Sequence, residues 1–332
     1  MPCTRSNERH RPAGPLLTRL LPLLLAGACA YAPAPQYPRQ ALPPTFSAAT
    51  GPRTLRPPEL LSTEDLGFCR QRGTLQSRDE ASGGETVEFE LWRTPDERTG
   101  PRPLVLLVPI LAGGADLMQN VALRLQARGF DVAFCERAGS ALKPPQRGPE
   151  LEELFRRTVL HQRLLLAWLR TLDPAPHGTF VLGMSLGGMV ATAVAALEPD
   201  LEGIAICLSG GDLPTLVPDS QEARVQAWVR WRRETDGIGT DHLQWELRRE
   251  IDLEPVRMAA SVDTKKVLFV SAFYDAVIPR RNQDLLWEAL GRPARLTVPL
   301  GHYTAALAID PILSAAADHF TSRIPHPASP GR

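Results

Sequence analysis

The sequence predicts an α/β fold in which a mostly parallel central sheet carries helices on both faces and a small helical lid insertion. Three observations support this fold class. Short apolar runs alternate with helical patterns along most of the chain, as in repeated strand–helix units. The run at residues 104–110 (LVLLVPI) is apolar throughout, as expected for a strand that is buried on both faces. The 332 residues are 43% hydrophobic and 22% charged, which suits a chain with a sizeable core.

The first half of the folded region contains five expected elements. An alternating pattern predicts an early antiparallel strand at residues 87–92 (VEFELW), and the buried run at 104–110 follows it. Leucine spacing predicts a helix at 117–127, and FDVAFC predicts a strand at 130–135. Residues 151–172 have the period of a long amphipathic helix.

The second half continues this alternation. We expect strands at residues 180–184, 204–208, 267–273 and 296–300, and helices at 186–197, 283–290 and 305–320. Residues 212–265 are too many for a simple crossover, and they contain helical patterns near 220–234 and 241–251. The tryptophans of the first pattern, Trp228 and Trp231, either face a substrate beneath a lid or pack within an extra helical hairpin.

The first 29 residues have the pattern of an export signal. Four arginines precede an apolar run at residues 20–28, and Cys29 follows it. The run is shorter than the ~20 residues that span a bilayer. Residues 25–29 (LAGAC) resemble a bacterial lipoprotein box, which implies lipidation of Cys29 and a membrane-anchored chain facing the periplasm or the exterior. Ordinary cleavage, which gives a soluble periplasmic or secreted protein, and an uncleaved N-terminal helix are the alternatives.

Proline is concentrated before the folded region. Twelve of the 32 prolines lie in the first 60 residues. Because proline fixes φ and removes a hydrogen-bond donor, residues 30–60 are expected to form an extended linker. The folded domain is expected at 61–322, with its lid-like insertion at 212–265 and a short tail at 323–332.

Several classes of function are not supported. Equal numbers of basic and acidic residues, 37 of each, argue against a nucleic-acid partner, which needs a basic surface. After processing, three cysteines would remain (Cys69, Cys135 and Cys207), with no C-x-x-C and no His/Cys spacing typical of zinc. We therefore expect no disulfide framework, no metal and no cofactor.

The strongest functional signal surrounds Ser185. The run GMSLGG at residues 183–188 directly follows an expected strand and begins an expected helix. A serine on such a tight turn needs neighbours without bulk, and Gly183 and Gly187 satisfy that need. The following helix directs its N-terminus at developing negative charge. Ser185 is therefore the candidate nucleophile.

With this motif the chain resembles the α/β-hydrolase-fold serine hydrolases, esterases among them, over most of residues 85–320. The resemblance implies a triad in the chain order serine, acid, histidine. Asp275 follows the strand expected at 267–273 and precedes Val-Ile-Pro, which matches the acid loop of the family. His302 follows the next expected strand in Gly-His-Tyr, which matches the histidine loop.

These residues have complementary roles. His302 would take the proton of Ser185 and return it to the leaving group, and Asp275 would hold the imidazole tautomer and stabilise the imidazolium. Asp212, after the strand expected at 204–208, is the runner-up acid because some members of the fold place the acid there.

An acyl-transfer site also needs two backbone donors for the oxyanion. The N–H of Leu186, the residue after the nucleophile, is the first. The second is expected after the strand at 104–110, where many relatives have His-Gly and this chain has Ile-Leu-Ala. Leu111 holds the corresponding position, with Ile110 and Ala112 as alternatives.

The expected function is cleavage of a carboxylic ester, or a related acyl bond, through an acyl-enzyme intermediate. The partner is then a small-molecule ester or acyl substrate, and a lipid anchor would be the contact with a membrane. A peptidase, an acyltransferase and a non-catalytic binding protein with the same fold are the alternatives, since a fold does not determine a substrate.

Overall fold

The computed structural model describes residues 55–77, 84–94, 102–111 and 115–324. The expected signal segment with Cys29, most of the expected linker and most of the expected tail lie outside these residues. Export, lipidation and the location of the mature chain therefore stay predictions from the sequence.

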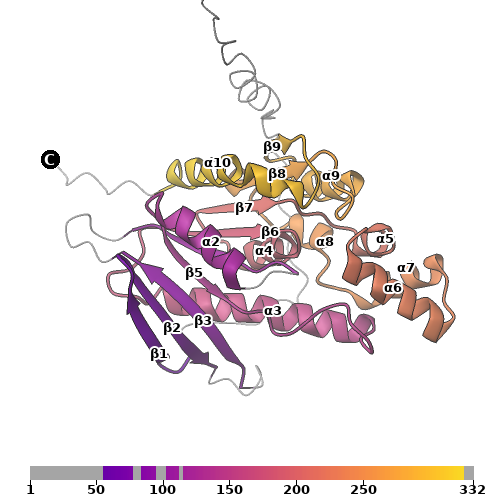
Figure 1. Ribbon diagram of the computed structural model, residues 1–332, viewed down its shortest axis with the longest axis horizontal. Helices are drawn as coiled ribbons and strands as arrows, with labels where there is room; N and C mark the ends of the chain where they lie inside the picture. Colours follow the sequence, from indigo (N-terminus) through magenta and orange to yellow (C-terminus); the bar gives the residue numbers. More distant parts are fainter. Residues whose placement is uncertain (1–54, 78–83, 95–101, 112–114, 325–332) are drawn as a thin grey trace, which may run out of the picture.

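One nine-stranded sheet crosses the described part of the molecule (Figure 1). Its strand order is β1-β2-β3-β5-β4-β6-β7-β8-β9. The first four strands in this order pair antiparallel, and the pairs from β5 to β9 are parallel. The strands are β1 (Glu59–Asp65), β2 (Cys69–Gln76), β3 (Thr86–Arg93), β4 (Leu104–Val108), β5 (Asp131–Cys135), β6 (Thr179–Met184), β7 (Gly203–Cys207), β8 (Val267–Ala272) and β9 (Ala294–Val298).

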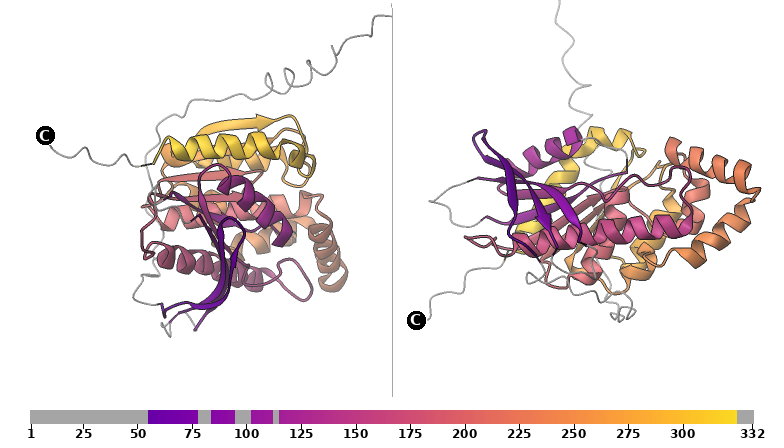
Figure 2. Two further views of the ribbon diagram at one scale, coloured as in Figure 1. Left: turned by 60° about the vertical axis from the view of Figure 1, so that its left-hand side comes forward. Right: turned by 90° about the horizontal axis from the view of Figure 1, so that it is seen from below.

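Helices cover both faces of this sheet (Figures 1 and 2). On one face, α2 (Ala115–Gln126) packs beside α10 (Ile309–Thr321). On the other face lie α3 (Gly148–Leu169), α4 (Leu186–Leu197) and α9 (Arg280–Ala289). The predicted fold class, a mostly parallel sheet between two layers of helices, is confirmed.

Strand β4 illustrates why the continuous apolar runs form the centre of the sheet. All five of its residues are buried. Leu104 and Leu106 belong to the core under α3 and α4, whereas Val105 and Leu107 belong to the core under α2 and α10. Because successive side chains of a strand point to opposite faces, a strand covered on both faces must be apolar at every position.

The sequence does not predict β1 and β2. Their sequences, ELLSTED and CRQRGTLQ, are largely polar, and β1 is mostly exposed. They extend the sheet beyond β3 as an edge hairpin, which depends on backbone pairing more than on burial. The first strand begins at Glu59, two residues before the expected boundary of the domain. Strand β9 likewise begins two residues earlier than expected.

The segment between β7 and β8, which includes residues 212–265, is helical. It contains α5 (Leu213–Asp219), α6 (Ala223–Asp236), α7 (Thr240–Glu250) and α8 (Pro255–Ala259). Helices α6 and α7 match the two predicted patterns and lie at the end of the molecule opposite β1, β2 and β3 (Figure 2). Helices α5 and α8 are too short to give a periodic signal.

The tryptophans of α6 pack within the insertion. Trp228 is fully buried, and its Nε1–H donates to the carbonyl of Gln146 at 2.9 Å. Beside it, the buried guanidinium of Arg232 pairs with Asp236 and Glu246. Trp231 packs against the same apolar cluster. The sequence leaves open whether these tryptophans face a substrate or pack within the helical segment. In the structure both pack within it.

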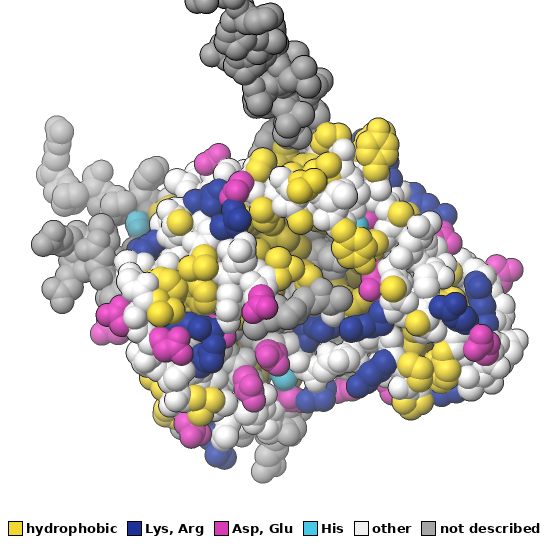
Figure 3. Space-filling model, viewed as in Figure 1, with side chains coloured by type: hydrophobic (Ala, Val, Ile, Leu, Met, Phe, Trp, Pro, Cys, Tyr) yellow, Lys and Arg dark blue, Asp and Glu magenta, His cyan; other side chains and the backbone are white. Residues whose placement is uncertain are grey.

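The surface of the described chain reflects its balanced charge. Basic and acidic side chains are interspersed over the face shown in Figure 3, without one large region of a single sign. No helix among the described residues combines the length and the apolar character that crossing a membrane requires.

Helix α10 contributes a buried histidine that makes stability depend on pH. His319 is 8% exposed, and its Nε2–H donates to the carbonyl of Lys266 at 3.0 Å. Burial lowers the pKa of His319 to about 4, and the charge of Arg323 acts in the same direction. Because this pKa lies below the unfolded value of about 6.5, the stabilisation is fully present above pH ~6.5. It is lost as the pH falls towards 4.

We expect the free energy of unfolding to fall by up to about 3 kcal/mol across that window because of this one group. Urea unfolding of the wild type and His319→Gln at about pH 7 and about pH 4 tests the expectation. The variant should show a smaller change between the two conditions, while the exposed His242→Gln should behave like the wild type. An unchanged pH dependence in His319→Gln would contradict the assignment.

Candidate active site

Ser185 occupies a strained turn between β6 and α4. Its φ of 54° and ψ of −124° are unusual for a residue with a side chain, and such backbone costs about 1–3 kcal/mol. The turn is held by hydrogen bonds from the Ser185 N–H to the Cys207 carbonyl and from the Gly188 N–H to the Ser185 carbonyl, both 2.9 Å. The hydroxyl therefore stands at the carboxyl edge of the sheet, where ligands bind in open α/β folds.

The glycines around Ser185 are required by close backbone contacts. A Cβ at Gly183 would lie 2.1 Å from the carbonyl oxygen of Gly187, and one at Gly187 would lie 2.4 Å from that of Val108. A Cβ at Gly188 would lie 2.5 Å from the Cβ of Ser209. Helix α4 can pack this closely against β6, β4 and the end of β7 only because these three positions lack side chains.

A hydrogen-bonded chain connects Ser185, His302 and Asp275. The Nε2 of His302 lies 3.0 Å from the Oγ of Ser185, and its Nδ1 lies 2.8 Å from the Oδ2 of Asp275. A carboxylate can only accept, so Nδ1 carries the proton and Nε2 is free to accept the hydroxyl proton of the serine. The structure thus brings together the three residues that the family resemblance indicates.

Asp275 is positioned by the loop that follows β8. Its side chain is fully buried. One oxygen, Oδ1, accepts the N–H groups of Val277 and Ile278 at 2.9 and 2.8 Å. The other oxygen is left to His302. Two backbone donors therefore determine which way the carboxylate faces before any substrate binds.

The loops that carry the acid and the histidine are joined to each other. The N–H of Tyr274 donates to the carbonyl of Leu300 at 2.9 Å. In the histidine loop, the N–H of Gly301 donates to the Oγ1 of Thr304 at 2.9 Å. Since β8 and β9 are neighbouring parallel strands, the two loops leave the sheet side by side and hold His302 against Asp275.

The runner-up acid, Asp212, is used elsewhere. It is the residue before α5 and has a left-handed backbone, with φ of 57°. Its Oδ2 accepts the hydroxyl of Thr215 at 2.5 Å. None of the hydrogen bonds found among the described residues joins it to His302.

A buried glutamate that the sequence analysis missed connects the start of the insertion to the start of α8. Glu254 accepts the N–H groups of Asp212 and Leu213 through Oε1, and those of Val256 and Arg257 through Oε2. Burial raises the pKa of Glu254 despite these four hydrogen bonds. The Glu-Pro pair that begins α8 is a usual helix start, and it is the signal that could have indicated a capping role.

An apolar cavity of about 270 Å³ opens beside Ser185. It is lined by Ser185, His302 and Leu186, by Ile110 and Leu111 after β4, and by apolar side chains of the insertion, among them Leu213, Leu216, Val217 and Val225. The acid at its border, Glu222, accepts the N–H of Val225 and caps α6. Residues of the segment between β7 and β8 therefore supply one wall of the cavity.

The two expected oxyanion donors lie at this cavity. Leu186 is the first residue of α4, and the first N–H groups of a helix have no partner within it. Leu111 is buried where the chain leaves β4. Ala112, one of the alternatives for the second donor, lies outside the described residues, so Leu111 stays a prediction.

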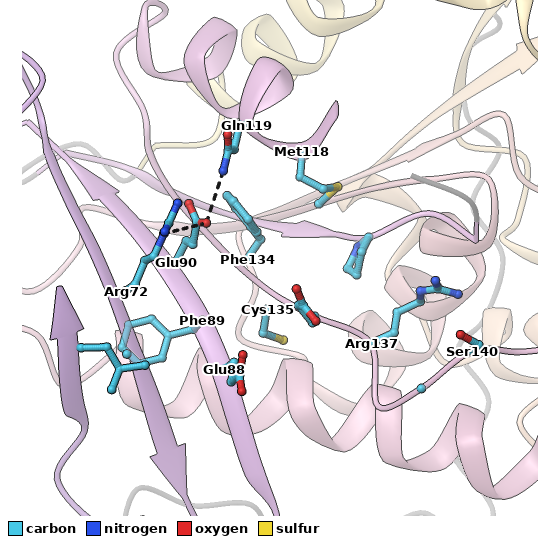
Figure 4. Close-up of a pocket in the computed structure, with 15 residues that line it drawn as sticks. Arg72, Glu88, Phe89, Glu90, Met118, Gln119, Phe134, Cys135, Arg137 and Ser140 are labelled. Carbon is cyan, nitrogen blue, oxygen red and sulfur yellow. Dashed lines mark hydrogen bonds and ion pairs between the residues drawn. The ribbon is translucent and has the colours of Figure 1, made fainter. Parts of the chain in front are cut away.

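A second, more polar cavity of about 600 Å³ lies between β2, β3, α2 and the residues that follow β5 (Figure 4). Among its lining residues, Arg72 pairs with Glu90 at 3.2 Å, and Gln119 donates to Glu90 at 3.4 Å. Groups of three or more His, Cys, Asp or Glu side chains that could hold a metal were not found among the described residues.

Comparisons with known proteins agree with this architecture. No family model and no curated protein matches the chain. Among solved structures, acetyl xylan esterase 1 from Thermoanaerobacterium is similar, with a TM-score of 0.59 and 17% identity over 78% of this chain and 87% of that one. A carboxyl esterase from Bacillus coagulans has a TM-score of 0.53 and 14% identity over 77% and 99%.

An esterase from Pyrococcus furiosus has a TM-score of 0.52 and 11% identity, covering 89% of this chain and all of the other. Identities this low speak only to architecture. Together with the strand order and the strained serine turn between β6 and α4, these likenesses establish that the chain has the α/β-hydrolase fold.

Proposed function

We propose that this protein is a serine hydrolase that cleaves carboxylic esters, with Ser185 as nucleophile, His302 as general base and acid, and Asp275 as the group that orients the histidine. The observation that carries the proposal is the hydrogen-bonded chain from Asp275 through His302 to Ser185, which ends at an apolar cavity. A neutral imidazole that is held by a buried carboxylate can accept the serine proton as the hydroxyl attacks.

The reaction proceeds in two halves. In the first, the Oγ of Ser185 bonds to the ester carbonyl carbon while its proton passes to the Nε2 of His302. The carbonyl oxygen, now an anion, accepts N–H groups from Leu186 and Leu111. The C–O bond to the alcohol then breaks, and His302 gives the alcohol its proton. In the second half, water repeats these steps on the acyl-enzyme and releases the acid and the free serine.

The cavity favours an acyl group with apolar character. Its walls are mainly leucine, valine, isoleucine and methionine side chains, so an aliphatic chain would lose water there with a gain of about 25 cal/mol per Å² of buried apolar surface. Several of the similar solved structures are esterases, which supports a small-molecule ester as the substrate class.

A fluorophosphonate probe tests the nucleophile. The wild type should be labelled on Ser185, and Ser185→Ala should remain unlabelled with kcat for p-nitrophenyl esters lowered by about 10⁵-fold or more, since the nucleophile acts as a unit with its base. The exposed Ser140→Ala is the matched control and should label like the wild type. Folded wild-type protein that fails to label, or labelling that persists in Ser185→Ala, would refute the proposal.

A further inference from the structure

Arg137 is a half-buried cation that the proposed chemistry does not use. It follows β5 at the carboxyl edge of the sheet, two strands from β6 in the sheet order. Its Nη1 atom is buried and has no hydrogen-bond partner among the described residues. Figure 4 shows its side chain extending away from Glu88 and Glu90, the acidic residues labelled at the same cavity.

The charge of Arg137 is poorly compensated. Burial lowers its pKa, and the neighbouring charge of Arg224 lowers it further, while Glu136 acts in the opposite direction. A guanidinium stays charged in proteins regardless. A buried donor such as Nη1 that has lost water without gaining a partner is costly to a fold. The guanidinium of Arg137 is therefore suited to bind an anionic group that is part of a ligand.

Arg137 also lines a small cavity of about 80 Å³ that shares walls with the one at Ser185. Among the described residues that line this space it is the sole charged side chain, and nearly all the others are apolar. Four residues form walls of both cavities: Leu142, Leu186, Leu213 and Val217. An acyl chain that extends inward from Ser185 past these side chains would reach the space that Arg137 faces.

We propose that Arg137 binds a carboxylate at the far end of the acyl chain, so that the preferred substrates are half-esters of dicarboxylic acids. A guanidinium and a carboxylate form two parallel N–H···O bonds, and the unpartnered Nη1 supplies one of the two donors. This inference rests on the proposed ester hydrolysis. The distal carboxylate takes no part in bond breaking, and the products are the alcohol and the dicarboxylic acid.

Paired substrates test the proposal. The p-nitrophenyl half-esters of adipic, suberic and sebacic acid are compared with the p-nitrophenyl esters of hexanoic, octanoic and decanoic acid. The wild type should favour at least one half-ester over its neutral partner by about tenfold or more in kcat/KM, mainly through KM, as for a charge-assisted hydrogen bond. Equal rates, or preference for the neutral ester in every pair, would overturn the proposal.

Variants assign the preference to Arg137. Arg137→Gln should abolish the preference by lowering kcat/KM for the half-esters more than for the neutral esters, and Arg137→Lys should restore part of the preference. Arg249→Gln removes a positive charge from the exposed surface of α7, where Arg249 stacks over Trp245, and should keep the wild-type preference. A preference that survives Arg137→Gln would overturn the assignment.

Thermal unfolding separates recognition from a structural role. Since Nη1 has no hydrogen-bond partner within the described part of the chain, Arg137→Met should raise the unfolding midpoint of the free protein. A lowered midpoint would show that Arg137 supports the fold and would overturn the inference. Fluorophosphonate labelling does not depend on the distal carboxylate. If the enzyme is labelled but shows no half-ester preference, this inference alone is refuted. If the folded enzyme is not labelled, the proposed function is refuted.

Discussion

Asp275→Asn should lower kcat about 10⁴-fold while leaving the fold intact. In the wild type, Oδ1 of Asp275 accepts two backbone N–H groups and Oδ2 accepts the Nδ1–H of His302. The asparagine oxygen would keep the two backbone donors, which places the amide NH₂ opposite Nδ1. That NH₂ can only donate, so the proton moves to Nε2, and the imidazole can no longer accept the proton of Ser185.

The matched control is Asp212→Asn, because both acids follow a strand at the same edge of the sheet. Asp212 accepts the hydroxyl of Thr215, an interaction that an amide oxygen can also make. Its kcat should stay within a few-fold of the wild type. Steady-state kinetics with a p-nitrophenyl ester, with circular dichroism to verify folding, shows which of the two acids acts with His302. A large loss in Asp212→Asn with activity retained in Asp275→Asn would reverse the assignment.

Gly183→Ala is the second change with a large expected effect. The new Cβ would lie 2.1 Å from the carbonyl oxygen of Gly187 and 2.8 Å from the Cβ of Ala191. The first contact is with backbone, so no rotamer change can relieve it, and α4 must move away from β6. We expect destabilisation of about 3 kcal/mol or more and, in protein that still folds, a loss of about 10²-fold in kcat from displacement of Ser185.

A second glycine-to-alanine change isolates this effect. Gly239 precedes α7, lacks a positive φ and has no atom within 4 Å of a built Cβ. Gly239→Ala should therefore change the free energy of unfolding, measured in urea, by less than about 1 kcal/mol and preserve activity. If Gly183→Ala is as stable and as active as Gly239→Ala, the close contact of α4 with β6 is not required for the serine turn.

The arrangement of Ser185, Asp275 and His302 could be predicted from the sequence because each of these residues stands at a strand end. Ser185, Asp275 and His302 each follow an apolar run, and the carboxyl ends of parallel strands share one edge of a sheet. The order serine, acid, histidine along the chain then limits the acids that can pair with His302. Choosing between Asp275 and Asp212 required the resemblance to a family, because both follow buried strands. The register of β8 with β9 is what brings the first of them to His302.

Other features were not accessible because their signals are not periodic. Strands β1 and β2 are polar and pair through their backbones at the edge of the sheet, so burial leaves no pattern in their residues. The wall that α5 contributes to the cavity belongs to a helix of seven residues with two prolines. The roles of Glu254 and Arg137 depend on their burial among segments that are distant in the sequence, so no short stretch of sequence indicates them.

The contacts of Glu254 allow the helices that shape the cavity to vary independently of the residues proposed to carry out the reaction. One carboxylate ties the start of the insertion, at Asp212, to the start of α8, at Val256. With these two points held together, a doubling of the segment between them adds only about 0.6 kcal/mol of closure entropy. Helices that shape the cavity can therefore be lengthened, exchanged or lost over evolution while the edge that holds Ser185, Asp275 and His302 keeps its geometry.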